Sequence, residues 1–241
     1  MAKRSLITEI FYIVRNMRCG EVYDALKRYG RGDILDVGGR DFYLVAKRRN
    51  IDFNAWTTLD DRLDDEMARI DDKRYRFIQG DGCNMKFADN TFDTILNLQV
   101  LEHVLFPVKM VEEIARVLRP KGHAIFLIPQ TSVLHEAPGH YYNFTRFWIM
   151  EAMKKAGLKI VEIKPIGGIW SSMASHFLHF FLKSARFHGM STPECKRNIF
   201  FYLLYPFMII YAAISIPICM ILGLGDLTEE PNNHIVVVTK P

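Results

Sequence analysis

Glycine, proline and cysteine are scarce in this chain of 241 residues, which has 15 glycines, 10 prolines and four cysteines. A glycine and proline content this low excludes a collagen-like chain, and 49% hydrophobic residues exclude a disordered one. The cysteines form no C-x-x-C pair and have no histidine at metal-binding spacing; they are Cys19, Cys83, Cys195 and Cys219. We therefore expect a reducing compartment, no structural zinc and no metal site.

A large excess of one charge is also lacking. The 31 basic and 27 acidic residues leave a net charge of +4, which does not predict a nucleic-acid partner. The first residues include the basic Lys3 and Arg4, as a signal peptide would. However, Glu9 follows before an uninterrupted apolar stretch develops, and no small-residue cleavage site follows. The sequence therefore predicts no secretory signal.

The apolar residues are concentrated in one place. Residues 199–224 contain no Asp, Glu, Lys, Arg or His. As a straight helix this stretch would reach about 39 Å, which is longer than the roughly 30 Å hydrocarbon core of a bilayer. Length alone therefore permits a membrane segment.

Elsewhere, short apolar runs alternate with amphipathic stretches. Strands are expected at 33–37, 55–59, 75–79, 94–98, 124–128, 159–163 and 235–239, and helices at 43–49, 107–118 and 146–156. Two shorter helices are expected within 5–29, split near Gly20. This alternation predicts an α/β fold, Rossmann-like, with a mainly parallel seven-stranded sheet and helices on both faces. The α/β domain is expected to span 31–168 and 231–241, with N-terminal helices in 1–30 and an apolar helical insertion in 169–230.

Three successive strands end in acidic or glycine-rich turns, in a sheet whose ligand should lie at the carboxyl ends of its strands. The first turn contains Asp36, Gly38 and Gly39, where a tight turn brings backbone N–H groups close to a ligand. Asp60 ends the next strand and could accept hydrogen bonds from a ribose diol, and Asp81 follows the third. Each turn alone could be ordinary loop structure. Together they predict one nucleotide-like site.

An ordered series of five motifs resembles a class I S-adenosylmethionine-dependent methyltransferase, closest to the ubiquinone and menaquinone biosynthesis group. The motifs are Ile34-Leu35-Asp36-Val37-Gly38, Leu59-Asp60, Gly80-Asp81-Gly82, Gln99-Val100-Leu101-Glu102-His103 and Leu118-Arg119-Pro120-Lys121-Gly122. The resemblance implies S-adenosylmethionine as cofactor. It places Asp36, Gly38 and Gly39 in the loop under the methionine part, Asp60 at the ribose hydroxyls, Asp81 and Gly82 at the adenine, and Gln99 at the methionine part or the substrate. Arg40 and Phe42 stand where the family commonly has glycines, and Arg40 could instead pair with the cofactor carboxylate.

Methyl transfer is an in-line displacement that depends on proximity and orientation, with a general base where the acceptor is a hydroxyl or amine. Candidates lie in the loop after the fifth expected strand. His140 is the first choice and His135 the second, as base or acceptor-positioning residues, and Tyr141 is expected to line the acceptor pocket. The alternative is that these histidines only bond backbone groups. His103 is expected to be structural.

The apolar insertion has three interpretations. In the first, an amphipathic helix lies on a membrane surface and a kinked or re-entrant pair of helices, broken at Pro206 and Pro217, enters it; the nearby basic residues Lys183, Arg186, Lys196 and Arg197 would then meet lipid headgroups. In the second, the segment is a buried helix or a dimer interface of a cytoplasmic enzyme. In the third, it is a single span with the last strand outside the sheet.

These features predict a methyltransferase on the cytoplasmic side of a membrane, acting on an O, N or C atom of a hydrophobic or lipid-linked small molecule. The alternative is a non-catalytic, membrane-tethered module that binds the cofactor. The oligomeric state is not predicted.

Overall fold

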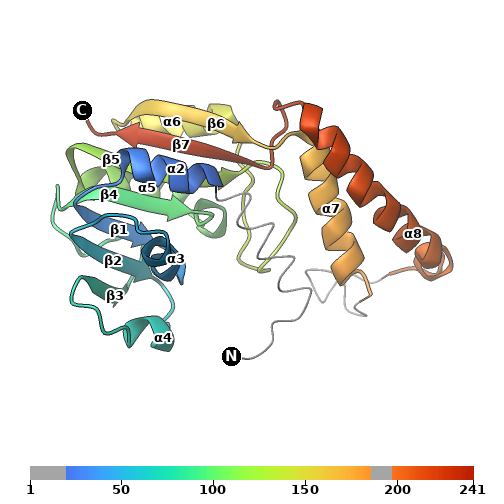
Figure 1. Cartoon of the computed structure of the whole chain (residues 1–241), viewed down its shortest axis with the longest axis horizontal. Coiled ribbons are helices and arrows are strands. Elements are labelled where there is room, and N and C mark those ends of the chain that lie inside the picture. The colour runs from blue at the N-terminus through green and yellow to red at the C-terminus, as the bar shows by residue number, and fades with distance from the viewer. Residues whose placement is uncertain (1–19, 186–196) are drawn as a thin grey trace.

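The computed structural model describes residues 20–185 and 197–241 of the chain. Its strands form one seven-stranded sheet in the order β3-β2-β1-β4-β5-β7-β6 (Figure 1). The strands are β1 (Asp33–Val37), β2 (Ala55–Asp60), β3 (Tyr75–Gln79), β4 (Phe92–Leu98), β5 (Leu118–Pro129), β6 (Lys159–Ile166) and β7 (Asn233–Thr239). β7 is antiparallel to both of its neighbours, and the remaining pairs are parallel. The predicted mainly parallel sheet is confirmed.

Helices cover both faces of this sheet. On one face α2 (Gly20–Tyr29) and α3 (Phe42–Arg48) pack through Leu26 and Tyr43 onto Trp56 of β2. On the other, α5 (Pro107–Val117) and α6 (Arg146–Lys155) contribute Ile114 and Ile149 to a second core cluster. A short helix, α4 (Asp65–Ala68), precedes β3. Of the two helices predicted within 5–29, the second is α2, and the first lies outside the described residues.

β5 begins six residues earlier than the sequence predicts, immediately after α5. Phe92 pairs with Leu118, and the register of β4 and β5 then shifts before Thr94 pairs with His123. Gly122 sits at this bulge, where a Cβ would lie 2.8 Å from the Arg119 carbonyl oxygen and 2.9 Å from that of Asp93. The Pro-Lys-Gly segment therefore forms a bulge inside a strand rather than a loop between helix and strand.

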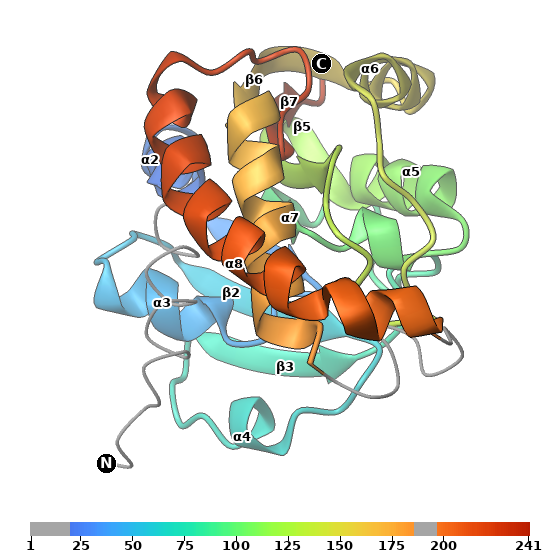
Figure 2. The same ribbon diagram turned by 90° about the vertical axis from the view of Figure 1, so that its right-hand side faces the viewer.

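The insertion forms a helical hairpin of α7 (Ile169–Lys183) and α8 (Ile199–Leu222), which stands beyond the carboxyl ends of the parallel strands (Figures 1 and 2). The helices run antiparallel: the Phe177 and Tyr211 rings lie 5.6 Å apart, and the hydroxyls of Ser184 and Tyr205 lie 3.2 Å apart. The expected break into two helices is wrong, because α8 continues through Pro206 and Pro217. A proline removes one backbone hydrogen bond, so it bends a helix without necessarily ending it, and the first turns of α8 run at an angle to the rest (Figure 2).

The apolar surface of α8 is exposed. Within Ile199–Gly225 the most apolar window of 18 residues has a mean hydropathy of 2.4, and 11% of that window is buried within the chain. Phe207 and Ile221 are 70% and 68% exposed. Among the described residues this is the one helix long and apolar enough to cross a membrane. The expectation of a helix buried in the core of a single subunit is therefore wrong.

Candidate active site

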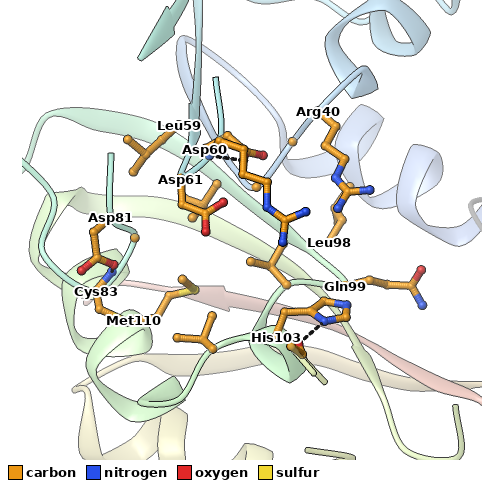
Figure 3. A pocket seen from close by; sticks show the side chains of 18 of the residues that line it. Arg40, Leu59, Asp60, Asp61, Asp81, Cys83, Leu98, Gln99, His103 and Met110 are labelled. Atoms are coloured by element: carbon orange, nitrogen blue, oxygen red, sulfur yellow. Dashed lines mark hydrogen bonds between the residues drawn. The ribbon is translucent and has the colours of Figure 1, made fainter. Parts of the chain in front are cut away.

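A cavity of about 730 Å³ lies at the carboxyl edge of the sheet, around the ends of β1, β2 and β4 (Figure 3). The strand order reverses between β1 and β4, and open α/β sheets bind ligands at such a point. Six of the seven predicted cofactor residues line this cavity: Gly38, Gly39, Asp60, Asp81, Gly82 and Gln99. The turns that follow three different strands therefore meet in one cavity of the size that holds a small molecule.

The seventh residue, Asp36, lies beneath the turn and not in the cavity wall. Its side chain is fully buried, and neither carboxylate oxygen has a hydrogen-bond partner among the described residues. A Cβ at Gly39 would overlap this carboxylate, and Gly38 has a φ of +71°. Burial raises the pKa of Asp36 to about 8; repulsion from Asp60 adds to this effect and the Trp56 indole opposes it. Asp36 therefore fills the space under a turn that only glycines can form.

Asp60 and Asp81 end or follow the neighbouring strands β2 and β3, at the same side of the cavity (Figure 3). One Asp60 oxygen accepts the backbone N–H of Arg62 at 3.0 Å, and one Asp81 oxygen accepts that of Cys83 at 2.7 Å. Burial raises the pKa of Asp60, and the charge of Arg40 opposes this shift. These bonds hold both carboxylates at the cavity wall, where each can accept hydrogen bonds from a ligand.

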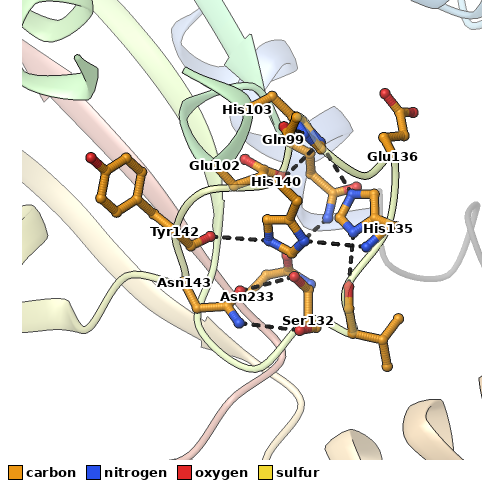
Figure 4. Close-up of polar contacts among 12 residues, drawn as sticks. Gln99, Glu102, His103, Ser132, His135, Glu136, His140, Tyr142, Asn143 and Asn233 are labelled. Carbon is orange, nitrogen blue, oxygen red and sulfur yellow. Dashed lines mark hydrogen bonds and ion pairs between the residues drawn. The ribbon is translucent and has the colours of Figure 1, made fainter. Parts of the chain in front are cut away.

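Gln99 follows β4 directly and has a φ of 56°. Its side-chain nitrogen donates to the Asn233 side-chain oxygen at 3.0 Å, and its backbone N–H donates to the Leu127 carbonyl at 2.8 Å (Figure 4). Gln99 therefore links β4 to β7 as well as lining the cavity.

An ion pair joins the two sides of the cavity. Arg40, in the turn after β1, lies 3.0 Å from Glu136 in the loop after β5. The sequence suggested the cofactor carboxylate as the partner of Arg40, whereas in this structure the partner is Glu136. Both side chains also line a second cavity of about 770 Å³, and Tyr141 lies in the wall of both cavities. The predicted acceptor-pocket residue thus lies where the two cavities adjoin.

The structure separates the two histidines chosen from the sequence. His135 lines the cavity, but His140 does not. His140 Nε2 lies 3.1 Å from the Tyr142 carbonyl, and its Nδ1 lies 3.3 Å from the backbone nitrogen of His135 (Figure 4). Both ring nitrogens thus bond the backbone, which is the alternative interpretation of a loop histidine. Of the two candidates, His135 is therefore the one that a ligand in this cavity could meet.

Sequence reasoning missed a contact between His103 and His135. His103 belongs to the short helix η1 (Leu101–His103), and its Nε2 lies 3.1 Å from Nε2 of His135. The neighbouring Glu102 is fully buried, and burial raises its pKa to about 8. The pair Glu102-His103, four residues after the end of β4, was a visible signal, but the loop that carries His135 to it could not be placed from sequence.

Comparisons with known proteins agree with this geometry. A family model described as a methyltransferase domain matches residues 49–126. An uncharacterized protein of Methanocaldococcus jannaschii is 32% identical over 154 residues, which cover 58% of this chain and 71% of that protein. A ubiquinone biosynthesis O-methyltransferase of Parvibaculum lavamentivorans is 29% identical over 106 residues, 35% of this chain and 42% of the relative. The chain belongs to the class I S-adenosylmethionine-dependent methyltransferases.

Further relatives and solved structures are similar to this methyltransferase. A 2-methyl-6-phytyl-1,4-hydroquinone methyltransferase of Oryza sativa is 28% identical over 149 residues, 57% of this chain and 42% of the relative. The crystal structure of an S-adenosylmethionine-dependent methyltransferase from Archaeoglobus fulgidus has a TM-score of 0.56 at 12% identity and covers 94% of this chain and 93% of its own. The [4+2]-cyclase SpnF has a TM-score of 0.58 at 19% identity, over 92% of this chain and 80% of its own. Likeness at these identities shows the fold, which hosts more than one chemistry.

The cavity of this methyltransferase fits the family's cofactor. The turn has no room for a side chain, because a Cβ at Gly39 would meet Asp36 and one at Gly38 would meet Val100, so its backbone can approach a ligand closely. Asp60 and Asp81 supply two carboxylates at the ends of adjacent strands, where hydroxyl and amino donors of a nucleoside can be bound. Bound there, S-adenosylmethionine supplies the methyl group.

Proposed function

We propose that this methyltransferase transfers a methyl group from S-adenosylmethionine to an O, N or C atom of a hydrophobic or lipid-linked small molecule at a membrane surface. The observation that carries this proposal is the position of the cofactor cavity at the carboxyl edge of the sheet, beyond which the exposed apolar hairpin stands (Figure 1). An acceptor held by that apolar surface lies on the side of the molecule where the methyl donor binds.

In this proposal the glycine turn, Asp60 and Asp81 bind the cofactor, and Gln99 lies at its methionine end. His135 and Tyr141 line the acceptor side. His135 acts as the base that takes the proton of a hydroxyl or amine acceptor, while the acceptor atom bonds to the methyl carbon and the carbon–sulfur bond breaks. His140 supports this step by holding the loop.

The hairpin supports a monotopic attachment. Asp226, after α8, accepts the backbone N–H groups of Trp170 and Ser171 at the start of α7, at 2.9 and 3.0 Å. The chain therefore leaves the hairpin where it entered, and β7 then pairs with β5 and β6. This excludes the interpretation in which α8 is a single span and the last strand lies outside the sheet.

The residues around the far end of the hairpin suit a phospholipid surface. Lys183 ends α7 and Arg197 lies two residues before the start of α8, so two cations lie at the end of the hairpin opposite to the one that joins the sheet. Arg186 and Lys196 lie outside the described residues. One relative's name contains a phytyl hydroquinone, which supports a hydrophobic acceptor for this chain. We propose the cytoplasmic side of the membrane as its location.

Cofactor binding is tested by titration calorimetry with S-adenosylmethionine. Asp60→Asn should weaken binding about 10- to 100-fold, the effect of losing charge-assisted hydrogen bonds. Asp24→Asn, on the exposed side of α2, is the matched control and should bind as the native chain does. Binding that is absent, or is unaffected by Asp60→Asn, would contradict the proposed site.

Transfer is tested with radiolabelled S-adenosylmethionine and a membrane lipid extract. His135→Ala should reduce labelling of lipid about 100-fold while cofactor affinity is retained. Tight cofactor binding without any labelling of lipid or soluble extract would instead identify the non-catalytic binding module.

Membrane attachment is tested by sedimentation with phosphatidylcholine vesicles, with and without phosphatidylserine. Introducing Phe207→Asp and Ile221→Asp together should move the protein from the pellet to the supernatant. Phe147→Asp, at a side chain that is 73% exposed on α6, is the matched control and should sediment with vesicles. The proposal would be overturned if the native chain does not bind vesicles and instead forms a dimer that the α8 substitutions abolish. The apolar surface of α8 would then be a protein interface.

A further inference from the structure

The rings of His103 and His135 meet edge to face at the cavity wall, and the Nδ1 atom of each ring already has a hydrogen-bond partner. His103 Nδ1 lies 2.7 Å from the Gly139 carbonyl oxygen, and His135 Nδ1 lies 2.9 Å from that of Val133. Because a carbonyl oxygen can only accept, both Nδ1 atoms carry hydrogen. In neutral rings both Nε2 atoms then present lone pairs, and these atoms lie only 3.1 Å apart. Two lone pairs this close repel unless a cation lies between them.

A buried carboxylate completes the group (Figure 4). Glu102 has 0% of its surface exposed, and neither of its oxygens has a hydrogen-bond partner among the described residues. One of these oxygens lies 3.9 Å from His103 Nε2, and the donor atoms of Glu102, His103 and His135 all lie within 4.8 Å of one another. Leaving a buried carboxylate unpaired is costly. Three electron-pair donors thus converge at this point.

We propose that Glu102, His103 and His135 bind a divalent transition-metal ion. Two imidazoles and one carboxylate are a known ligand set for zinc sites that keep a position open, whereas Mg²⁺ and Ca²⁺ prefer oxygen ligands. The backbone carbonyls on both Nδ1–H groups are the outer partners that fix the orientation of metal-binding histidines. The site uses no cysteine, so the cysteine spacing, from which we expected no metal, does not bear on it.

The position of this site gives the metal a role that depends on the proposed function. His103 and His135 both line the cofactor cavity, beside Tyr141. An acceptor oxygen that occupies the open position would lose its proton to water more easily and then attack the methyl carbon, as the carbon–sulfur bond breaks and its electrons return to sulfur. With the metal bound, His135 would hold the metal instead of acting as the base, and the site would in this way both bind and activate an oxygen acceptor.

The test uses the full chain, freed of tags and treated with chelator. Calorimetric titration with Zn²⁺ at pH 7.5 should show one site per chain. His135→Gln and Glu102→Gln should each weaken it about 100-fold or more, because even outer partners of metal ligands contribute 10- to 100-fold. His176→Gln, on α7, should leave it unchanged. Co²⁺ bound in the same site should show the ligand-field absorption of a low-coordinate ion, and this absorption should be absent from His135→Gln.

Each outcome decides the proposal. The metal site is refuted if Zn²⁺ and Co²⁺ do not bind, or if the native chain and His135→Gln bind them equally. The close contact between the two Nε2 atoms is then explained by a proton shared between the histidines. The thermal midpoint of His135→Gln checks that it is folded, and Glu102→Gln provides the second variant. S-adenosylmethionine binding is titrated in parallel with and without chelator. Cofactor binding without metal binding refutes only the metal site, whereas metal binding without cofactor binding refutes only the proposed function.

Discussion

Replacing Asp36 by Asn should remove a pH dependence from the stability of this methyltransferase. Asp36 is fully buried beneath the glycine turn, and its pKa is raised to about 8 from an ordinary value of 3.8. Desolvation is the main cause, and the carboxylates of Asp60 and Asp41 add to it. Asparagine has a similar shape and no charge, so it fills the same space without titrating.

The sign follows from the protons that each state binds. In the unfolded chain Asp36 is ionised above about pH 4, whereas in the folded chain it keeps its proton up to about pH 8. The folded state therefore binds more protons in this range, and stability falls as the pH rises. Between pH 6 and pH 8 the loss from this one group is about 2 kcal/mol, or about 4–8 °C in the thermal midpoint of a chain of this size. Asp36→Asn should abolish this part of the slope.

The assay is urea unfolding, followed by far-UV circular dichroism, at pH 6 and pH 8 without cofactor. Asp72→Asn is the matched control: Lys47 and two other donors lower the pKa of Asp72, so it is ionised in both states throughout this range. Its substitution should shift the stability equally at both pH values. If native and Asp36→Asn chains lose the same stability between pH 6 and pH 8, Asp36 is not protonated in the folded state and the reasoning is wrong.

Two other substitutions test the local geometry. Gly39→Ala places a Cβ on the Asp36 carboxylate and should cost about 1–3 kcal/mol of stability and weaken binding of S-adenosylmethionine in calorimetry, whereas Gly225→Ala, where a Cβ meets nothing within 4 Å, should do neither. Lys240 Nζ donates to the Asn90 side chain at 2.7 Å and to the carbonyls of Leu118 and Arg116 at 3.0 and 3.2 Å, so Lys240→Ala should lower the free energy of unfolding by about 1–2 kcal/mol. The exposed Lys73→Ala is its control, and equal urea midpoints for the two variants would show that these bonds contribute nothing.

The sheet and the turns that line the cavity at its carboxyl edge could be predicted because their signals are local. Buried parallel strands appear in the sequence as short apolar runs, and the turns at their ends need glycine or a carboxylate at fixed positions. Asp60 ends β2 and Asp81 lies two residues after the end of β3, so predicting the strands also placed both side chains at one edge. The buried position of Asp36 was less visible, because its place below the turn depends on the conformation of Gly39.

The loop on the other side of the cavity could not be predicted in the same way. It spans residues 130–145, which contain no regular element, and the positions of its side chains depend on contacts with distant turns. Arg40 bonds Glu136 from 96 positions away, and His103 meets His135 from 32 positions away. No periodicity in the sequence encodes such pairs. The helical break expected at Pro206 failed for a related reason, since the same residue either ends or bends a helix according to what packs around it.

The place of the apolar segment in the chain restricts how the enzyme can meet its acceptor. The hairpin is inserted between β6 and β7, which pair with each other along their length. Asp226 binds the end of the hairpin to the start of α7. Insertion of α8 into a bilayer would therefore fix the positions of both β6 and β7, and with them the sheet, relative to the membrane. The cofactor cavity therefore keeps a defined orientation to a membrane that holds the hairpin. If the proposed function holds, an acceptor confined to that membrane needs to move only along its surface to reach the cavity, whereas a soluble acceptor gains nothing from the hairpin. Phe207→Asp together with Ile221→Asp should accordingly reduce transfer to a lipid acceptor far more than it reduces the affinity for S-adenosylmethionine.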